Sequence, residues 1–247
     1  MGREERATVA WVLGGGSGIG RGVAEALAAD GRLVVVSGRR AEELDATVAR
    51  VAASGNRAVA LPVDVSDGAS VLAARDAIER DHGAVGLLVY SAGTNVANRF
   101  WNDTTPEDFA RVLDVNLTGA TRAVHAVLDG MRANGGGLVV LVSSWAAWRF
   151  SPGAGAAYSA SKTAMASLAE TLNAQERHHG VRATHLCPGE VRTDILKTRP
   201  VVPGEAEQEL MLTAEDLGSV VRFLADLPAR VCVNEIVITP TSNTSYN

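Results

Sequence analysis

Cysteine is scarce in this sequence: Cys187 and Cys232 are its only two, which are too few for a disulfide framework. No apolar stretch approaches the roughly 18 residues that a membrane-spanning helix needs. The formal net charge is -5 at pH 7, so the chain lacks the basic excess that attracts nucleic acid or anionic lipid. These absences predict a reduced, cytoplasmic protein that binds neither nucleic acid nor a membrane.

Short apolar runs alternate with longer amphipathic segments along the chain. The runs predict seven strands, at residues 8–13, 33–36, 58–63, 87–90, 138–142, 183–187 and 236–239. They are apolar at nearly every position, as strands buried on both faces are. The amphipathic segments predict helices at residues 21–29, 41–53, 70–80, 106–131, 156–177 and 214–225.

This alternation indicates an α/β fold, with a Rossmann-type, doubly wound, mostly parallel seven-stranded sheet and helices on both faces. At 247 residues, with 47% hydrophobic and 21% charged residues, the whole chain (1–247) is expected to form a single domain. Residues 190–212, which contain Pro200 and Pro203, fit neither pattern and are expected to form a substrate-binding lid.

Glycines crowd the turn after the first apolar run, which reads Gly14-Gly15-Gly16-Ser17-Gly18-Ile19-Gly20. Glycine allows a tight strand-to-helix turn, lets the backbone approach a pyrophosphate and aims helix N-terminal amides at the anion. No Lys-Ser or Lys-Thr pair follows, as a triphosphate-binding P-loop requires. The turn therefore predicts a dinucleotide site, the alternative being an ordinary glycine-rich loop.

The spacing Gly-x-x-x-Gly-x-Gly resembles that of the short-chain dehydrogenase/reductase family, and the resemblance extends along almost the whole chain. Further matching motifs are Asp64-Val65, Ala92-Gly93, Asn116, Ser143-Ser144, Tyr158-Ser159-Ala160-Ser161-Lys162, Pro188-Gly189 and Thr193. The resemblance implies catalytic roles for Asn116, Ser144, Tyr158 and Lys162, and assembly as a homodimer or homotetramer. The glycine turn, the two arginines after the second predicted strand and these motifs together predict cofactor contacts at Gly14, Gly16, Ser17, Gly18, Ile19, Gly20, Arg39, Arg40, Asp64, Val65, Ala92, Gly93, Tyr158, Lys162, Pro188, Gly189, Val191 and Thr193.

Tyr158 and Lys162 share one face of a predicted helix because they lie four residues apart. A free tyrosine has a pKa of about 10, and lowering that pKa to about 7 requires about 4 kcal/mol. One positive charge at about 4 Å, at an effective dielectric constant near 20, supplies about that much. The pair is therefore able to donate and accept a proton near neutral pH. Taken alone, such a pair is usually a solvated helix face; its place after a strand that ends in serine favours catalysis.

Ser143 and Ser144 compete for the role of hydrogen-bond donor to a substrate carbonyl oxygen, the alternative for either being a strand-end cap. We favour Ser144 because the family's catalytic serine lies nearer the tyrosine. Ser144 precedes Tyr158 by one residue more than is usual, so an extra residue is expected in the loop of residues 151–155.

Asn116 falls at the edge of an apolar helix stripe, as a buried structural amide would; the resemblance implies that it holds a water connecting Lys162 to solvent.

Two positions depart from the family pattern. The family has threonine where Leu13 stands, and an asparagine pair where Tyr90 and Ser91 stand. Those family residues tie the sheet to the glycine turn by hydrogen bonds. We expect the departures to affect stability or cofactor affinity more than activity.

The second predicted strand leads into Gly38, Arg39 and Arg40. An acidic residue there accepts hydrogen bonds from the ribose hydroxyls and selects NAD, whereas an arginine pairs with a 2′-phosphate and selects NADP. Gly38 occupies the expected acidic position and Arg39 follows it. The sequence therefore favours NADP(H) over NAD(H), the alternative being two solvated arginines before a helix.

No metal site is expected, because the five histidines show no ligand spacing with cysteines or carboxylates. Cys187 and Cys232 are expected to be packed thiols. Aromatic residues follow the serine pair, and they line either a substrate pocket or a subunit contact: Trp145, Trp148 and Phe150.

Together these observations predict an NADP(H)-dependent oxidoreductase that interconverts an alcohol and a ketone or aldehyde, both small molecules. Tyr158 is the expected acid/base, Ser144 the carbonyl donor and Lys162 the ribose ligand, with Asn116 supporting proton relay. One alternative is an NAD-linked alcohol dehydrogenase. Another is a regulatory protein that senses the dinucleotide without turnover, and the intact catalytic set argues against it.

Overall fold

The computed structural model of the protein describes residues 9–198 and 201–243, so Thr8 and Pro200 of the predicted elements lie outside the described residues. Its sheet contains β1 (Val9–Leu13), β2 (Val34–Gly38), β3 (Ala58–Pro62), β4 (Val85–Tyr90), β5 (Gly137–Val142), β6 (Val181–Pro188) and β7 (Glu235–Ile238). The seven strands lie in the order β3-β2-β1-β4-β5-β6-β7, and every neighbouring pair is parallel. The predicted Rossmann-type fold is therefore confirmed, and the sheet is wholly parallel.

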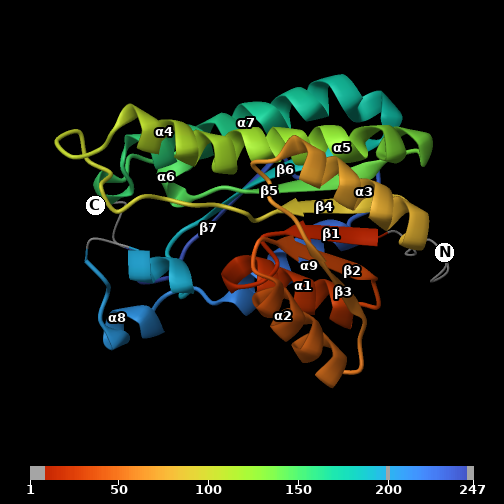
Figure 1. Ribbon diagram of the computed structural model, residues 1–247, viewed down its shortest axis with the longest axis horizontal. Coiled ribbons are helices and arrows are strands. Elements are labelled where there is room, and N and C mark those ends of the chain that lie inside the picture. The colour runs from red at the N-terminus through yellow and green to blue at the C-terminus, as the bar shows by residue number, and fades with distance from the viewer. Residues whose placement is uncertain (1–8, 199–200, 244–247) are drawn as a thin grey trace.

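Helices cover both faces of the sheet (Figure 1). They are α1 (Gly18–Ala29), α2 (Ala41–Ala53), α3 (Gly68–His82), α4 (Pro106–Leu113), α5 (Gly119–Ala133), α6 (Trp145–Trp148), α7 (Ala156–Glu176), α8 (Glu205–Glu209) and α9 (Ala214–Asp226). One core cluster joins α3, α5 and α7 to the sheet, and the other joins α1, α2 and α9 to its opposite face. Among the helices that the structure describes, none has the length and apolar character to span a membrane.

The central strands have the burial that their continuous valine and leucine runs predict, but the two edge strands do not. β1 is buried at all five positions, whereas β3 and β7 are mostly half-buried. An edge strand has a neighbour on one side only, so its outer margin meets solvent whatever its sequence. The prediction of seven strands buried on both faces is wrong for these two.

The strand order changes direction between β1 and β4. After β3 the chain crosses back over the sheet, so β4 lies beside β1 although β2 and β3 separate them in sequence. Leu13 is the register partner of Tyr90, and the Ser91 N–H continues the ladder by donating to the Leu13 carbonyl oxygen at 2.8 Å. The turns after β1 and β4 therefore meet. A ligand-binding crevice in a doubly wound sheet opens at such a point.

The single helix predicted for residues 106–131 is two helices, α4 and α5, joined by a π-helix at Asp114–Thr118. At this break the Tyr90 hydroxyl donates a hydrogen bond to the Val115 carbonyl oxygen. Apolar periodicity continues through the break, so the sequence pattern does not indicate it. Short π-helical turns inside α-helices occur often at functional sites, and this one contains Asn116.

Candidate active site

The turn between β1 and α1 contains the close backbone contacts that its glycines predict. Gly14 has a φ of +84°, and a Cβ there would lie 2.6 Å from the Ala92 backbone nitrogen. A Cβ at Gly20 would overlap the Gly14 carbonyl oxygen. α1 begins at Gly18, so the N–H groups of its first turn lack partners within the helix. The residues present thus form a bare backbone cradle suited to a pyrophosphate.

Two side chains that the sequence analysis missed hold this glycine turn against α2. The Arg21 guanidinium donates to the Gly16 carbonyl oxygen and, at 2.9 Å, to Glu43. The fully buried Thr47 hydroxyl donates to the Gly15 carbonyl oxygen at 3.0 Å. A threonine on the apolar face of the predicted helix 41–53 was the available signal, because a buried hydroxyl requires a partner.

Arg39 and Arg40 follow β2 beside this turn. The Arg40 guanidinium donates to the Ser17 hydroxyl at 3.4 Å and lies 3.6 Å from Glu43. Arg39 is exposed, and no described residue hydrogen-bonds to its guanidinium. Arg40 is thus partly engaged, and Arg39 is the more available cation.

Asp64 follows β3 and is held by Ser66. Its carboxylate accepts from the Ser66 backbone N–H at 2.9 Å and the Ser66 hydroxyl at 2.6 Å. These bonds, with a smaller contribution from the positive charge of Arg39, lower the pKa of the Asp64 carboxyl. The next carbonyl oxygen, that of Val65, accepts from Arg122 at 3.1 Å. Asp64 is therefore a fixed anion on the same side of the crevice as Arg39.

Asn116 is fully buried at the centre of the π-helix. Its Oδ1 accepts from the Thr94 N–H at 2.7 Å, and its Nδ2 donates to the Thr94 carbonyl oxygen and the Ser161 hydroxyl, both at 3.0 Å. A Cβ at Gly93 would lie 3.4 Å from Lys162 Nζ and 3.6 Å from Asn116 Oδ1. The amide has structural partners; its role in proton relay stays a prediction.

The two serines after β5 have different environments. The Ser143 hydroxyl donates to the Lys162 carbonyl oxygen at 2.9 Å and is buried. Ser144 is half-buried, and its Oγ accepts from the Ala146 N–H at 3.2 Å as the N-cap of α6. A hydroxyl that accepts one bond keeps its proton for another. Ser143 thus has its proton committed, while the Ser144 proton is available to a ligand.

Tyr158 and Lys162 lie in the first turns of α7, with Lys162 Nζ 5.8 Å from the centroid of the Tyr158 ring. The ammonium is deeply buried and donates to the Val142 carbonyl oxygen at 2.8 Å. Burial lowers the pKa of Lys162 to about 8. The predicted shared face is present, and burial disfavours the charged form of this lysine.

The segment after β6 returns the chain to the glycine turn. Beyond Pro188, the Gly189 N–H donates to the Ile238 carbonyl oxygen at 2.7 Å. A Cβ at Gly18 would lie 3.1 Å from Thr193 Cγ2. Thr193 therefore packs directly against the start of α1, and its cofactor role stays a prediction.

The base of the predicted lid is closed by hydrogen bonds between its two ends. Val191 forms an isolated bridge with Leu212, and the Leu212 N–H donates to the Glu190 carbonyl oxygen at 3.0 Å. Within the segment lie a 3-10 turn at Asp194–Thr198 and the short helix α8. The lid role itself is a prediction.

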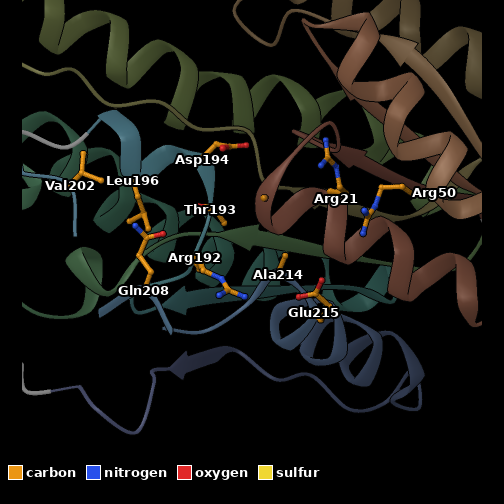
Figure 2. A pocket seen from close by; sticks show the side chains of 11 residues that line it. Arg21, Arg50, Arg192, Thr193, Asp194, Leu196, Val202, Gln208, Ala214 and Glu215 are labelled. Atoms are coloured by element: carbon orange, nitrogen blue, oxygen red, sulfur yellow. The ribbon is translucent and has the colours of Figure 1, made fainter. Parts of the chain in front are cut away.

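A cavity of about 430 Å³ lies between α1 and this segment (Figure 2). Its volume falls within the range common for small-molecule sites. Gly18 and Thr193 belong both to its lining and to the predicted cofactor contacts. The other lining residues are Arg21, Arg50, Arg192, Asp194, Leu196, Val202, Gln208, Ala214 and Glu215.

The aromatic residues after Ser144 differ in exposure. Trp145 is buried and its ring centroid lies 5.1 Å from that of Trp148. The Arg149 guanidinium stacks over Trp148 at 3.7 Å, and Phe150 is 88% exposed. Trp145 and Trp148 thus pack against each other in α6, which begins directly after the serine pair.

The cysteine predictions are half right. Cys187 is buried within β6, whereas Cys232 is exposed, so the predicted packed thiol is wrong there. Cys232 lies in the irregular connection before β7 and is exposed although its thiol contacts Asn173 of α7 and the Ala183 carbonyl oxygen of β6. Sequence spacing did not indicate a further cluster, in which donor atoms of His185, Cys187 and Glu235 lie within 4.8 Å of one another.

Comparisons with known proteins agree with this arrangement. A family profile described as short chain dehydrogenase matches residues 8–201. The glycine betaine reductase ATRR of Emericella nidulans is 33% identical over 237 residues, which is 94% of this chain but 18% of that protein. The short-chain reductase protein NovJ of Streptomyces niveus is 34% identical over 88% of this chain and 87% of its own.

Among solved structures, the alcohol dehydrogenase from the archaeon Thermococcus sibiricus, complexed with 5-hydroxy-NADP, has a TM-score of 0.83. It is 27% identical and covers 96% of this chain and 97% of its own. The chain therefore belongs to the short-chain dehydrogenase/reductase family, a family of oxidoreductases.

Proposed function

We propose that the protein interconverts an alcohol and a ketone or aldehyde, with NADP(H) as hydride carrier. The proposal rests on the side chains that meet at Gly93. This glycine lies in the turn after β4, the strand beside β1 and its glycine turn. Lys162 Nζ and Asn116 Oδ1 both border Gly93, so the basic chemistry and the dinucleotide cradle share one crevice. When bound there, the reduced nicotinamide supplies the hydride.

Two residues of α7, Tyr158 and Lys162, and Ser144 before α6 carry out the acid/base chemistry. The Tyr158 hydroxyl gives its proton to the carbonyl oxygen during reduction and accepts it back during oxidation. The Ser144 hydroxyl, whose proton is available, donates a hydrogen bond to the same oxygen and stabilises the negative charge that develops there. The Lys162 ammonium contributes positive charge beside the phenol and is held by the Val142 carbonyl oxygen. In the proposed relay, Asn116 positions a water between Lys162 and solvent.

Preference for NADP(H) is proposed from charge. Arg39 is exposed and hydrogen-bonds to no described residue, while Gly38 offers no carboxylate to repel a phosphate. A guanidinium meets a phosphate with a planar fork of donors. The Thermococcus sibiricus relative, solved with a derivative of NADP, supports this choice. NAD-linked alcohol oxidation is the alternative.

A panel of aldehydes, ketones and alcohols, followed by absorbance of the reduced nicotinamide, tests the activity. Tyr158→Phe should lower turnover about 100-fold to 10,000-fold while leaving cofactor binding nearly intact, because only the ionisable hydroxyl is lost. More than a tenth of the wild-type rate in this variant would refute the role of Tyr158. Cofactor binding without turnover on any member of the panel would favour the nucleotide-sensing alternative. Sedimentation of the purified protein tests the predicted homodimer or homotetramer.

A further inference from the structure

A side-chain cluster outside the proposed catalytic set joins β6 to β7. His185 and Cys187 are two residues apart on β6, so their side chains point to the same face of the sheet. Glu235 is the register partner of His185 on β7. Strand periodicity and register together therefore bring an imidazole, a thiol and a carboxylate to one place.

The separations are close to those of a small metal centre. His185 Nδ1 lies 3.0 Å from Glu235 Oε1, and Cys187 Sγ lies 3.4 Å from the same nitrogen. Zinc bound at about 2.0 Å to nitrogen and oxygen and about 2.3 Å to sulfur places neighbouring donors about 3.2 to 3.8 Å apart. Cys187 Sγ also lies 3.5 Å from His185 Nε2 and thus faces the imidazole ring. Coordination therefore requires the imidazole to turn, and Glu235, whose side chain is 43% exposed, to shift slightly.

We propose that His185, Cys187 and Glu235 bind a thiophilic divalent cation such as Zn²⁺, with water completing the coordination. Nitrogen, sulfur and oxygen donors together suit zinc, whereas magnesium and calcium require oxygen ligands throughout. The cation takes the position between His185 Nδ1 and Glu235, and the imidazole keeps its proton on Nε2. The thiol loses its proton to solvent as the sulfur–metal bond forms, so binding releases protons.

Access from solvent agrees with a site that fills from the sheet edge. β7 is the last strand of the sheet, and Glu235 reaches solvent from it, while the His185 and Cys187 side chains are buried beneath. A cation entering at this edge therefore meets the carboxylate first and the imidazole and thiol next.

Occupancy should be inhibitory, an inference that rests on the proposed function. The Lys162 ammonium donates to the Val142 carbonyl oxygen at 2.8 Å, and Val142 is the register partner of Leu186, the residue before Cys187, so the cluster lies close to the strand position that holds Lys162. The cation adds two positive charges and the thiol releases one proton, so the local charge rises by one unit. That charge disfavours the Lys162 ammonium, which burial already destabilises.

Cobalt substitution tests the site without reference to turnover. Co²⁺ is titrated into the full-length, tag-free protein under reducing conditions, and the thiolate-to-cobalt absorption band is recorded. Wild type should bind one Co²⁺ per chain with this band, and Zn²⁺ should displace it. Cys187→Ser should abolish the band, and Glu235→Gln should weaken binding at least tenfold. Cys232→Ser is the matched control, because the exposed Cys232 thiol lies outside the cluster and hydrogen-bonds with Asn173, Asn234 and the Ala183 carbonyl oxygen.

Loss of the band in Cys232→Ser, its survival in Cys187→Ser, or no band in wild type would overturn the site. In the turnover assay, Zn²⁺ should slow wild type, and Glu235→Gln should keep its basal rate while needing at least tenfold more Zn²⁺ for the same inhibition. Equal inhibition of wild type and Glu235→Gln by Zn²⁺ would show that the inhibitory zinc binds at another site. Because the absorption band does not depend on catalysis, failure of the proposed activity would leave the cation site intact.

Discussion

Replacing Ser144 by alanine should reduce turnover while changing stability little. The Ser144 hydroxyl is half-buried, accepts the Ala146 N–H and, among residues 9–198 and 201–243, donates to no other group, so it retains a proton for the substrate. Removal of one donor to a developing oxyanion raises the barrier by about 2.7 to 4 kcal/mol, which is about 100-fold to 1,000-fold in rate. The lost cap costs toward the low end of about 0.5 to 2 kcal/mol of stability, because α6 has only four residues.

Ser143→Ala should show the opposite pattern. Its hydroxyl donates to the buried Lys162 carbonyl oxygen at 2.9 Å. The Lys162 carbonyl oxygen keeps its hydrogen bond within α7, so the variant loses one net hydrogen bond, which costs about 0.5 to 1.5 kcal/mol of unfolding free energy. Its effect on the rate should be mild, because the Ser143 proton is already used within the protein.

The assay pairs steady-state kinetics with urea unfolding of both variants at the same pH and cofactor concentration. The reasoning predicts a crossed outcome, in which one variant loses kcat and the other loses stability. If Ser143→Ala loses the rate and Ser144→Ala does not, the assignment of the two hydroxyls is reversed. The extra loop residue would then lie somewhere other than residues 151–155.

Three further predictions concern buried polar groups and cofactor charge. Burial lowers the pKa of Lys162 to about 8, so the unfolded chain binds more protons between pH 8 and about 10.5. Wild-type stability relative to Lys162→Met should therefore rise with pH in this window, by up to about 3 kcal/mol in urea unfolding; a flat difference would contradict the burial argument. Wild type should bind NADPH about 10-fold to 100-fold tighter than NADH in fluorescence titration, less so at high salt, and Gly38→Asp with Arg39→Ser should reverse this. Equal or tighter binding of NADH by wild type would show that the Arg39 side chain points to solvent and does not contact the cofactor. Tyr90→Phe should lose about 1 to 3 kcal/mol in urea unfolding, because the buried Val115 carbonyl oxygen loses its donor, and unchanged stability would refute this.

Much of the fold follows from local pattern. Continuous apolar runs with turns between them indicate buried parallel strands, because a strand covered by helices on both faces has no polar side to show. The helix predicted at residues 41–53 matches α2 at both ends. The glycine turn is equally local, since close backbone contacts at Gly14 and Gly20 exclude larger side chains.

Periodicity does not report where a helix changes its hydrogen-bond pattern. The π-helix around Asn116 interrupts a stripe that stays apolar throughout, and its Tyr90 partner comes from a strand about 25 residues earlier. Edge exposure of β3 and β7 likewise depends on their place in the sheet.

The sequence by itself determined the fold class, the family and the residue types available for chemistry, because these depend on composition and spacing along one chain. Only the tertiary structure decided which hydroxyl of the serine pair has a free proton, because that depends on the Lys162 carbonyl oxygen reaching Ser143 from another element. It also decided that Lys162 is buried enough to lower its pKa, and that Glu235 meets His185 across two strands. Burial and cross-strand contact are properties of the packed sheet, and no local pattern encodes them.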